Sequence, residues 1–362
     1  MNSEKRATTR VALVGCGQIA DAHLQEIRKV PGATLVGVCD RHRDLAAQAA
    51  ARFGVPGIYT DLGQMLAAAR PDVLHVTTPP HSHAAIAKQA LAAGLHVYVE
   101  KPFTPDVDEA DEILAAAEEA GRLVCVGHDQ LFDPAWEDVR RLRSRGDLGQ
   151  VVHVDSSQGY HLDGPFGRAL LDDPEHWVHR LPGGLFQNVI SHAVYRITEF
   201  LPDEEPQVWA TWFGRKGAAD MPTELRVMMQ GQDVTASLVF SSTARPAQRV
   251  TRVLGTRGSV EVDLDARVVR WLRGPCLPGA FGKLDVPFRQ MRESFRQLRR
   301  NVWQFLRGDL QYFAGMNRLF RRFYAAAAAG SAPPIPYCEI RRVTAIMDAV
   351  FAACQIEQPA AY

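Results

Sequence analysis

Short apolar runs alternate with helical patterns through the first third of the chain. The apolar runs occupy residues 11–15, 35–39, 73–76, 96–99 and 123–126. Helical patterns lie between them, at residues 19–30, 44–53, 84–93 and 107–120. Strands that are apolar on both sides and alternate with helices are typical of a parallel sheet with helices on both faces. The pattern therefore predicts a doubly wound α/β domain over residues 1–128.

The rest of the chain has a different pattern. A helical pattern at residues 135–145 leads into a strand-like run at residues 151–159. Further strand candidates follow at residues 207–213, 224–229, 235–241, 249–254 and 260–264. Consecutive strands without long helices between them favour an antiparallel sheet. We therefore expect a second, α+β domain over residues 129–362, with a large, mainly antiparallel open sheet and a last helix at residues 339–353.

A basic amphipathic segment, residues 288–324, lies between these strands and the last helix. Its large apolar residues recur at spacings of three and four, which places them on one face of a helix: Phe288, Met291, Phe295, Leu298, Val302 and Phe305. Against Glu293 and Asp309 the segment has nine arginines, at positions 289, 292, 296, 299, 300, 307, 318, 321 and 322.

Two interpretations of this segment stay open. In the first, the apolar stripe packs against the chain's own domain or a second subunit, and the arginines form a solvated rim. In the second, the arginines bind an anionic ligand such as a nucleotide sugar or the headgroup of a lipid-linked sugar, because a guanidinium donates two parallel hydrogen bonds to phosphate. Aromatic residues that suit an interfacial membrane helix stand at Trp303, Phe305, Tyr312, Phe313, Phe320 and Phe323.

Composition and charge narrow the class of protein. The 362 residues include 41 basic and 41 acidic side chains, a formal net charge of zero, so charge gives no support to a nucleic-acid-binding protein. The N-terminus lacks the apolar stretch of a secretion signal, and no apolar run reaches the roughly 18–20 residues of a membrane-spanning helix, so we expect a cytoplasmic protein. No cysteine pair has the spacing of a zinc site, which predicts no metal and buried free thiols at Cys16, Cys39 and Cys125.

The first chemical motif follows the first predicted strand and reads Gly15-Cys16-Gly17-Gln18-Ile19-Ala20. Gly15 allows a tight turn, and Gly17 lets a pyrophosphate approach the backbone at the N-terminus of a helix, where free N–H groups favour anions. Ala20 takes the place of the third glycine of the dinucleotide-binding fingerprint. The strand before and the helix after the motif predict a Rossmann domain that binds a nicotinamide dinucleotide through Gly15, Gly17, Gln18 and Ile19.

Asp40 ends the second predicted strand, where its carboxylate can accept hydrogen bonds from the adenosine ribose. A carboxylate there repels a 2′-phosphate, so Asp40 favours NAD. Arg41 and Arg43 follow directly and are suited to bind that phosphate, which keeps NADP as the alternative cofactor.

Two further motifs follow the next strands. Thr78-Pro79 with His83 comes after the strand at residues 73–76, and Glu100-Lys101-Pro102 comes after the strand at residues 96–99. The carboxyl ends of parallel strands are where doubly wound sheets bind ligands. A lysine in such a cleft, partly buried beside a cationic nicotinamide, has a lowered pKa that suits it to proton transfer. A surface lysine that merely ends a strand is the alternative.

In the second half, Asn188 and His192 are four residues apart and share one face if residues 183–192 are helical. They are candidates to hold a substrate hydroxyl, with His192 moving its proton. A structural histidine on an apolar helix is the alternative. Tyr160, Trp177 and Arg180 are further candidates to line a substrate pocket.

Taken together, these motifs resemble the Gfo/Idh/MocA family, whose members include glucose–fructose oxidoreductase and inositol dehydrogenase. The resemblance rests on Gly15 to Ile19, Thr78-Pro79 with His83, Glu100-Lys101-Pro102, Gly183-Gly184 running on to His192, and Gly255 to Gly258. It implies a Rossmann domain followed by an α/β domain whose open sheet serves in oligomerisation. It also implies sugar or cyclitol substrates, with Lys101 as the active-site lysine and His192 as the catalytic histidine.

The sequence departs from that family at two positions. Many of its dehydrogenases have aspartate where Asn188 stands, and a basic residue is frequent where this chain has Leu131. Asparagine cannot hold a negative charge, so it cannot raise the basicity of His192 in the same way. We expect an NAD(P)-dependent oxidoreductase that moves a hydride between nicotinamide and a ring hydroxyl or ketone. A non-catalytic NAD-bound regulator and an NAD-dependent glycosidase are the alternatives.

Overall fold

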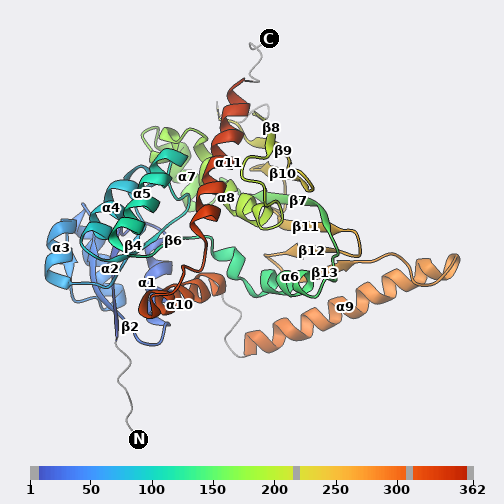
Figure 1. Cartoon of the computed structure of the whole chain (residues 1–362), viewed down its shortest axis with the longest axis horizontal. Coiled ribbons are helices and arrows are strands. Elements are labelled where there is room, and N and C mark those ends of the chain that lie inside the picture. The colour runs from blue at the N-terminus through green and yellow to red at the C-terminus, as the bar shows by residue number, and fades with distance from the viewer. Residues whose placement is uncertain (1–7, 215–220, 307–312, 357–362) are drawn as a thin grey trace, which may run out of the picture. The chain divides into compact units, whose positions relative to one another are not determined.

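The computed structural model describes residues 8–214, 221–306 and 313–356, and Figure 1 traces the chain. Two units emerge: residues up to Asp129 together with Gly315–Thr344, and Gln130–Ala314 together with the residues from Ala345 onward. The first boundary lies one residue from the sequence-based division. Assigning the whole remainder of the chain to a second domain was wrong, because residues 315–344 return to the first unit.

Six parallel strands form the sheet of the first unit: β1 Thr9–Val14, β2 Ala33–Cys39, β3 Ile58–Tyr59, β4 Val73–Val76, β5 His96–Val99 and β6 Val124–Val126. Their order is β3-β2-β1-β4-β5-β6, and every neighbouring pair is parallel. The doubly wound prediction is therefore confirmed. The order reverses between β1 and β4, and such a switch point is where these sheets bind ligands.

Helices α1 Ala20–Arg28, α2 Arg43–Phe53, α3 Leu62–Ala69, α4 His83–Ala92 and α5 Val107–Ala120 connect these strands. Asp106 caps α5 by accepting a hydrogen bond from Glu109 N at 2.9 Å, and Gly121 ends that helix in the left-handed conformation. A short 3-10 helix, Pro80–Ser82, precedes α4. Cys16, Cys39 and Cys125 are buried free thiols, as the sequence predicts.

Helix α10, Ala314–Ala329, belongs to the first unit because its aromatic face enters that unit's core. The Phe320 ring lies 4.7 Å from His75 and 4.9 Å from Tyr98, measured between ring centroids. Phe320 and Phe323 are completely buried. Their assignment to an interfacial membrane helix was therefore wrong. Helix α11, Tyr337–Ile356, follows.

The second unit contains a seven-stranded sheet of β7 Val151–Gly159, β8 Gln207–Phe213, β9 Glu224–Gln230, β10 Thr235–Ser241, β11 Arg249–Gly255, β12 Ser259–Asp263 and β13 Val268–Leu272. The order is β13-β12-β11-β7-β10-β9-β8, and only the β7–β10 pair is parallel. The prediction of a mainly antiparallel sheet is confirmed. Helix α8, Gly184–Thr198, contacts β7 and β10, and α6, Pro134–Ser144, contacts β12 and β13.

The elements that complete the second unit are α7 Pro165–Asp172, the 3-10 helix Trp177–Arg180, and the 27-residue helix α9 Ala280–Leu306. Helix α9 contacts β13 at the edge of the sheet, and its first half extends away from that sheet (Figure 1). The stripe residues Phe288 and Phe295 are 60% and 67% exposed, so packing of the stripe against the chain's own domain was wrong. Among the described helices, none has the length and hydrophobicity needed to cross a bilayer.

Candidate functional site

The loop after β1 needs glycine at position 15. Gly15 has φ +94°, and a Cβ atom there would lie 2.7 Å from both the Thr77 carbonyl carbon and the Thr78 nitrogen. Thr77 also holds Gly15 close to the end of β4, since its hydroxyl donates to Gly15 O at 2.7 Å. The loop is thus pressed against the end of β4, at the switch point of the sheet.

Gly17, in contrast, borders open space. A Cβ atom built there would meet no other heavy atom within 4 Å, and Gly17 and Gln18 are exposed. Helix α1 begins just beyond, and its N-cap residue Ile19 makes no side-chain capping hydrogen bond. The N-terminus of α1 therefore borders an open cradle at Gly17 that a side chain would fill, which fits a bound pyrophosphate.

Asp40 is fixed beside this cradle by two backbone hydrogen bonds. Its Oδ2 accepts from Cys16 N at 2.8 Å and its Oδ1 accepts from His42 N at 2.8 Å. Each carboxylate oxygen has a second lone pair with which to accept a ribose hydroxyl. Arg41 is exposed and donates to His42 Nε2 at 3.1 Å. The structure thus brings the predicted acid to the glycine loop, as an adenosine ribose requires.

The side chains of Ser82 and His83 hold the Thr78 loop, which follows β4, in place. Ser82 donates to Thr78 Oγ1 at 2.7 Å and to Pro79 O at 2.8 Å. His83 is completely buried, with Nε2 2.8 Å from Thr78 O and Nδ1 2.9 Å from Phe103 O. Burial lowers the pKa of His83, although both backbone hydrogen bonds oppose that shift. His83 therefore ties the loops after β4 and β5 together rather than presenting a ring to a ligand.

Glu100 ends β5 and heads a buried chain of hydrogen bonds. Its Oε1 lies 2.8 Å from His23 Nε2, and its Oε2 accepts from Lys101 N at 3.0 Å. His23 Nδ1 lies 2.9 Å from His75 Nδ1, and His75 Nε2 lies 2.7 Å from the Tyr324 hydroxyl. The sequence analysis missed His23, His75 and Tyr324, which come from α1, β4 and α10.

One arrangement of protons satisfies every member of this chain. Burial raises the pKa of Glu100, but the hydrogen bond from His23 and the charge and backbone N–H of Lys101 offset it and hold that pKa below its usual value. Burial, and then the neighbouring His23, hold the pKa of His75 well below its ordinary value. Tyr324 then donates to His75, His75 donates to His23, and His23 donates to an ionised Glu100. The network keeps a carboxylate beside the backbone of Lys101.

Lys101 lies directly after this carboxylate and is half-buried. Burial lowers the pKa of Lys101, while the charges of Glu100 and Asp129 act in the opposite direction. Gly127 makes room for this arrangement, because a Cβ there would lie 3.0 Å from Glu100 Oε1. A lysine with a lowered pKa at the carboxyl end of β5 gives up its proton more readily than an exposed lysine does.

In the second unit, the local structure explains why positions 183 and 184 are both glycine. A Cβ at Gly183 would lie 2.3 Å from the Phe351 ring, and Gly184 has φ +51°. Both positions therefore need glycine for α8 to begin where it does. The expected helix is confirmed over residues 184–192 as the first part of α8, and Gly183 is its N-cap residue.

Asn188 and His192 lie one turn apart on α8. Asn188 is 9% exposed and His192 is half-buried. His192 Nδ1 lies 2.7 Å from the Tyr195 hydroxyl, and that hydroxyl accepts from Gln130 N at 3.3 Å. The phenol of Tyr195 thus orients the imidazole, a partner that the sequence analysis did not anticipate.

Arg196 anchors the same helix to the sheet, and sequence reasoning also missed it. It is completely buried, and it donates from Nε to Thr251 Oγ1 at 3.0 Å and from Nη2 to Ser156 Oγ at 3.1 Å. A further bond joins it to the Gln130 side chain. Helix α8, and with it His192, is held rigidly against β7 and β11.

The predicted pocket residues are only partly brought together. Tyr160 and Trp177 both contact Phe166, with ring centroids 5.9 Å and 6.4 Å apart, so they belong to one aromatic cluster. Arg180 follows on the 3-10 helix just before α8 and is exposed. Aromatic side chains beside the start of α8 suit the apolar faces of a sugar ring or a similar ring.

Comparison with known proteins settles the family. Residues 9–128 match the model of the oxidoreductase family with an NAD-binding Rossmann fold, and residues 136–261 match the GFO/IDH/MocA C-terminal domain. The chain belongs to the Gfo/Idh/MocA family of oxidoreductases. The resemblance inferred from the motifs is thereby confirmed, as is an N-terminal domain of the NAD-binding type.

Curated relatives are similar over part of their length. An uncharacterised oxidoreductase of Schizosaccharomyces pombe is 31% identical over 189 residues, 51% of this chain and 50% of that protein. Inositol 2-dehydrogenase 4 of Saccharopolyspora erythraea is 36% identical over 145 residues, 40% of this chain and 43% of that protein. The chain thus spans about half the length, or less, of these relatives.

Solved structures extend the likeness of fold to the whole chain. The WlbA dehydrogenase from Bordetella pertussis, in complex with NADH and UDP-GlcNAcA, has a TM-score of 0.79 at 19% identity and covers 98% of this chain and 97% of its own. UDP-N-acetylglucosamine 3-dehydrogenase from Acidithiobacillus ferrooxidans has a TM-score of 0.72 at 20% identity, with 96% and 98% covered. At such identities these likenesses show the fold.

Proposed function

We propose that this protein is an NAD-dependent dehydrogenase that transfers a hydride between a ring carbon of a sugar, cyclitol or sugar derivative and the nicotinamide. The observation that carries the proposal is the site of the first unit, where an open glycine cradle, a fixed Asp40 and a lowered-pKa Lys101 lie at the carboxyl ends of β1, β2 and β5. Bound NAD would supply the hydride acceptor at its C4 atom.

The chain's own residues then have distinct roles. The N–H groups at the start of α1 bind the pyrophosphate, and Asp40 accepts the ribose hydroxyls, which favours NAD over NADP. Thr78 and Pro79 form one wall of the cofactor site, and His83 holds that wall in place through its hydrogen bond with Thr78 O. Lys101 holds the oxygen of the reacting carbinol or ketone and moves its proton.

His192 is the second group proposed to hold and move the substrate proton, on a helix that Arg196 fixes in place. Its Nδ1 lies 2.7 Å from the Tyr195 hydroxyl, and Asn188 stands one turn earlier. A carboxylate would raise the basicity of the imidazole, whereas a phenol and an amide only orient it.

Two relatives suggest which substrates to try first. Two of the solved structures that resemble this fold are a dehydrogenase bound to UDP-GlcNAcA and a UDP-N-acetylglucosamine 3-dehydrogenase. The test is a screen of sugars, cyclitols and nucleotide sugars in which NADH formation is followed by absorbance. We expect turnover with at least one member. Firm NAD binding without turnover on the whole panel would instead favour a non-catalytic regulator, the role that Asn188 suggests.

A second candidate activity has one observation in its favour. A glycosyl hydrolase family 109 protein of Streptomyces niveus is 30% identical over 202 residues, 51% of this chain and 40% of that protein. An NAD-dependent glycosidase would release a chromogenic leaving group from a nitrophenyl glycoside without net NADH formation. Adding such glycosides to the screen separates the two activities.

The open face of the second sheet supports self-association. Trp209, Phe213 and Met228 on the neighbouring strands β8 and β9 are 49%, 45% and 56% exposed. We therefore propose a homo-oligomer formed through this face. Light scattering of the Trp209→Ser/Met228→Ser variant would show a smaller particle than the wild type.

A further inference from the structure

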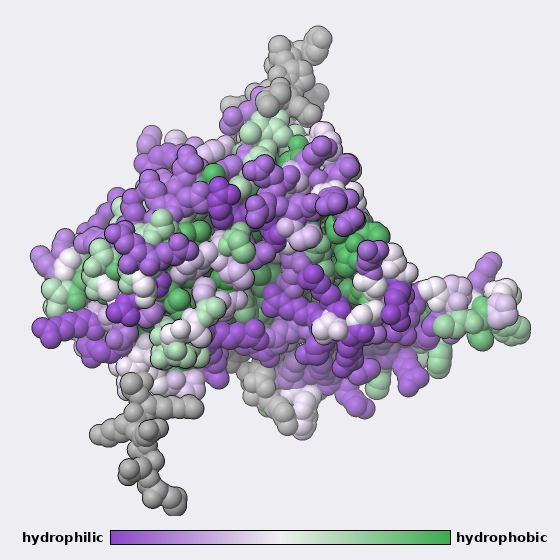
Figure 2. Space-filling view, viewed as in Figure 1, coloured by the Kyte–Doolittle hydropathy of each residue, from purple (hydrophilic) through white to green (hydrophobic). Residues whose placement is uncertain are grey.

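Helix α9 presents its apolar side to solvent. Its large apolar side chains are 48% to 71% exposed: Phe281, Leu284, Phe288, Met291, Phe295, Leu298, Val302, Trp303, Phe305 and Leu306. Figure 2 shows apolar residues along the part of α9 that extends to the right. We call these ten residues the α9 stripe. A helix of 27 residues is about 40 Å long, and a soluble monomer rarely exposes so continuous an apolar surface.

The polar side of α9 is the side bound to its own unit. Gln297 Nε2 donates to Val269 O at 3.2 Å, and Asn301 Nδ2 donates to Ala266 O at 3.1 Å. Arg300 forms an ion pair with Asp138 of α6. These bonds fix the rotation of the helix about its axis, so most of the stripe points away from the sheet, while Val302, Trp303 and Leu306 line a groove between α9 and α6. The usual orientation of an amphipathic helix is inverted here.

Cations border the stripe. Arg292 follows Phe288 by four residues and Arg299 follows Phe295 by four, so each guanidinium lies beside a stripe phenyl ring. Both arginines are exposed. The two carboxylates of α9 do not balance them, because Asp285 is paired with Arg289 and Glu293 lies half-buried toward the polar side.

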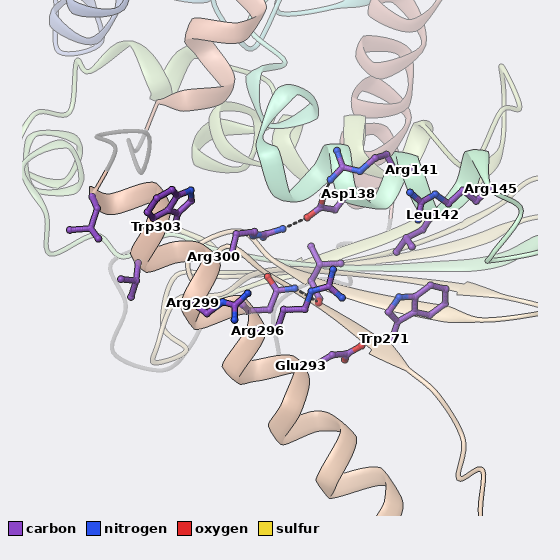
Figure 3. A pocket seen from close by; sticks show the side chains of 14 residues that line it. Asp138, Arg141, Leu142, Arg145, Trp271, Glu293, Arg296, Arg299, Arg300 and Trp303 are labelled. Atoms are coloured by element: carbon purple, nitrogen blue, oxygen red, sulfur yellow. Dashed lines mark hydrogen bonds and ion pairs between the residues drawn. The ribbon is translucent and has the colours of Figure 1, made fainter.

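A cationic groove runs beside the stripe between α6 and α9. It has a volume of about 930 Å³, and Arg141 of α6 and the C-cap residue Arg145 line it together with Arg296 and Arg299 of α9 (Figure 3). Two acids also line the groove: Asp138, which is paired with Arg141 and Arg300, and Glu293. Guanidinium groups lie on both walls of the groove. Each guanidinium can donate two parallel hydrogen bonds to the oxygens of a phosphate group.

The occupant that fits both features is a lipid surface rather than a second α9. Two copies of this helix, paired through their stripes, would bring arginine flanks together, and of the two carboxylates of α9 Asp285 is already paired with Arg289 and Glu293 lies toward the polar side. At the C-terminal turn Trp303 and Leu306 widen the face beyond the narrow seam of a coiled coil. Phenylalanine, leucine and tryptophan bordered by arginines are the composition of an interfacial helix.

We propose that α9 docks this protein on an anionic phospholipid bilayer. The α9 stripe enters the boundary between headgroups and acyl chains, and the arginines beside it and in the groove bind lipid phosphates. The inference stands independently of the dehydrogenase activity, because it uses no residue of the cofactor site.

Vesicle flotation with the purified full chain tests the proposal. We expect binding to phosphatidylcholine vesicles that contain phosphatidylglycerol, weaker binding to phosphatidylcholine alone, and a loss of binding as salt is added. The Phe288→Ser/Phe295→Ser variant should lower the partition coefficient about a hundredfold, since each buried phenyl side chain contributes about tenfold or more. The Arg292→Ser/Arg299→Ser variant should lower it about 25-fold, since each arginine contributes about fivefold.

Matched controls replace residues of the same kind elsewhere. Leu171 is 48% exposed on α7 and Leu45 is 38% exposed on α2, so Leu45→Ser/Leu171→Ser removes apolar surface away from α9. Arg168→Ser/Arg257→Ser removes two exposed arginines. Both control variants should float like the wild type, and thermal denaturation should show all variants folded.

Three outcomes would overturn the proposal. The first is a wild-type protein that stays unbound at low salt on anionic vesicles. The second is an α9 variant that floats as well as its control. The third is a stripe variant that changes only the particle mass in light scattering, which would assign the stripe to a second copy.

Discussion

Gly17→Val should abolish NAD binding while leaving the fold intact. A Cβ at this position meets no heavy atom within 4 Å, and Gly17 does not have the positive φ that valine would avoid. The free energy of unfolding should therefore change by no more than about 0.5 kcal/mol, as for an ordinary surface substitution. The new side chain instead fills the cradle in front of α1, where the pyrophosphate would lie.

The size of the binding loss follows from the hydrogen bonds that are blocked. Each hydrogen bond from a backbone N–H to a charged group contributes about 1.5–3 kcal/mol. Losing two of them costs at least about 3 kcal/mol, which weakens NAD binding at least about a hundredfold. Isothermal titration calorimetry measures the affinity, and circular dichroism with chemical denaturation measures the fold and its stability.

Gly15→Ala is the matched comparison, because a side chain at Gly15 should destabilise the fold, whereas one at Gly17 should only block NAD. Its Cβ would lie 2.7 Å from the backbone of Thr77 and Thr78, at a φ of +94°. Strain and overpacking together should lower the free energy of unfolding by about 2–6 kcal/mol. If Gly17→Val bound NAD with wild-type affinity, the assignment of the cradle to the pyrophosphate would be refuted.

Three other substitutions probe the acid, the lysine and the buried network. Asp40→Ala should weaken NAD binding and relatively favour NADP in calorimetry; an unchanged preference would remove Asp40 from the ribose site. Lys101→Met should lower kcat about a hundredfold to ten-thousandfold with nearly unchanged affinity for NAD, and equal turnover would exclude the lysine from catalysis. Glu100→Gln should lower the free energy of unfolding by about 1.5–3 kcal/mol at neutral pH, because His23 and Lys101 stabilise the ionised form. Since the pKa of Glu100 is lowered in the folded protein, that stabilisation is present above the ordinary glutamate pKa and is lost as pH falls through the folded value, so the difference from wild type should shrink in acid. A pH-independent difference in denaturation experiments would contradict an ionised Glu100.

The Rossmann unit could be read from sequence because its strands are uninterrupted apolar runs. Strands β4 and β5 and helix α5 have the bounds that the pattern predicts. Strand β3 was missed because two residues carry no periodicity, and β13 was missed because Arg270 interrupts its apolar residues. The return of α10 was missed because only tertiary packing of Phe320 on His75 and Tyr98 reveals it.

The sequence predicted those site residues that are neighbours in a short motif. It did not predict those whose partners are far away along the chain. Glu100 and Lys101 are adjacent, but His23 is 77 residues from Glu100, and Tyr324 is 249 residues from His75. Arg196 looks like an ordinary basic residue in the last turn of a helix until sheet pairing brings Ser156 and Thr251 to it.

Helix α9 shows a further limit of pattern reading. The sequence gives the apolar stripe and the arginines, but periodicity does not say which side faces the protein. That depends on the carbonyl groups of Ala266 and Val269, which accept from Asn301 and Gln297. The polar side therefore turns inward and the stripe turns out.

The most direct test of the central claim follows a single hydrogen atom. Each ring substrate found in the NAD screen would be prepared with deuterium on the carbon that carries the oxidised hydroxyl, and the NADH formed would be examined by mass spectrometry. The account predicts deuterium in the nicotinamide ring with the wild-type protein, at a rate lowered at least about a hundredfold by Lys101→Met. NAD firmly bound, with no deuterium entering the nicotinamide from any sugar, cyclitol or nucleotide sugar, would contradict it.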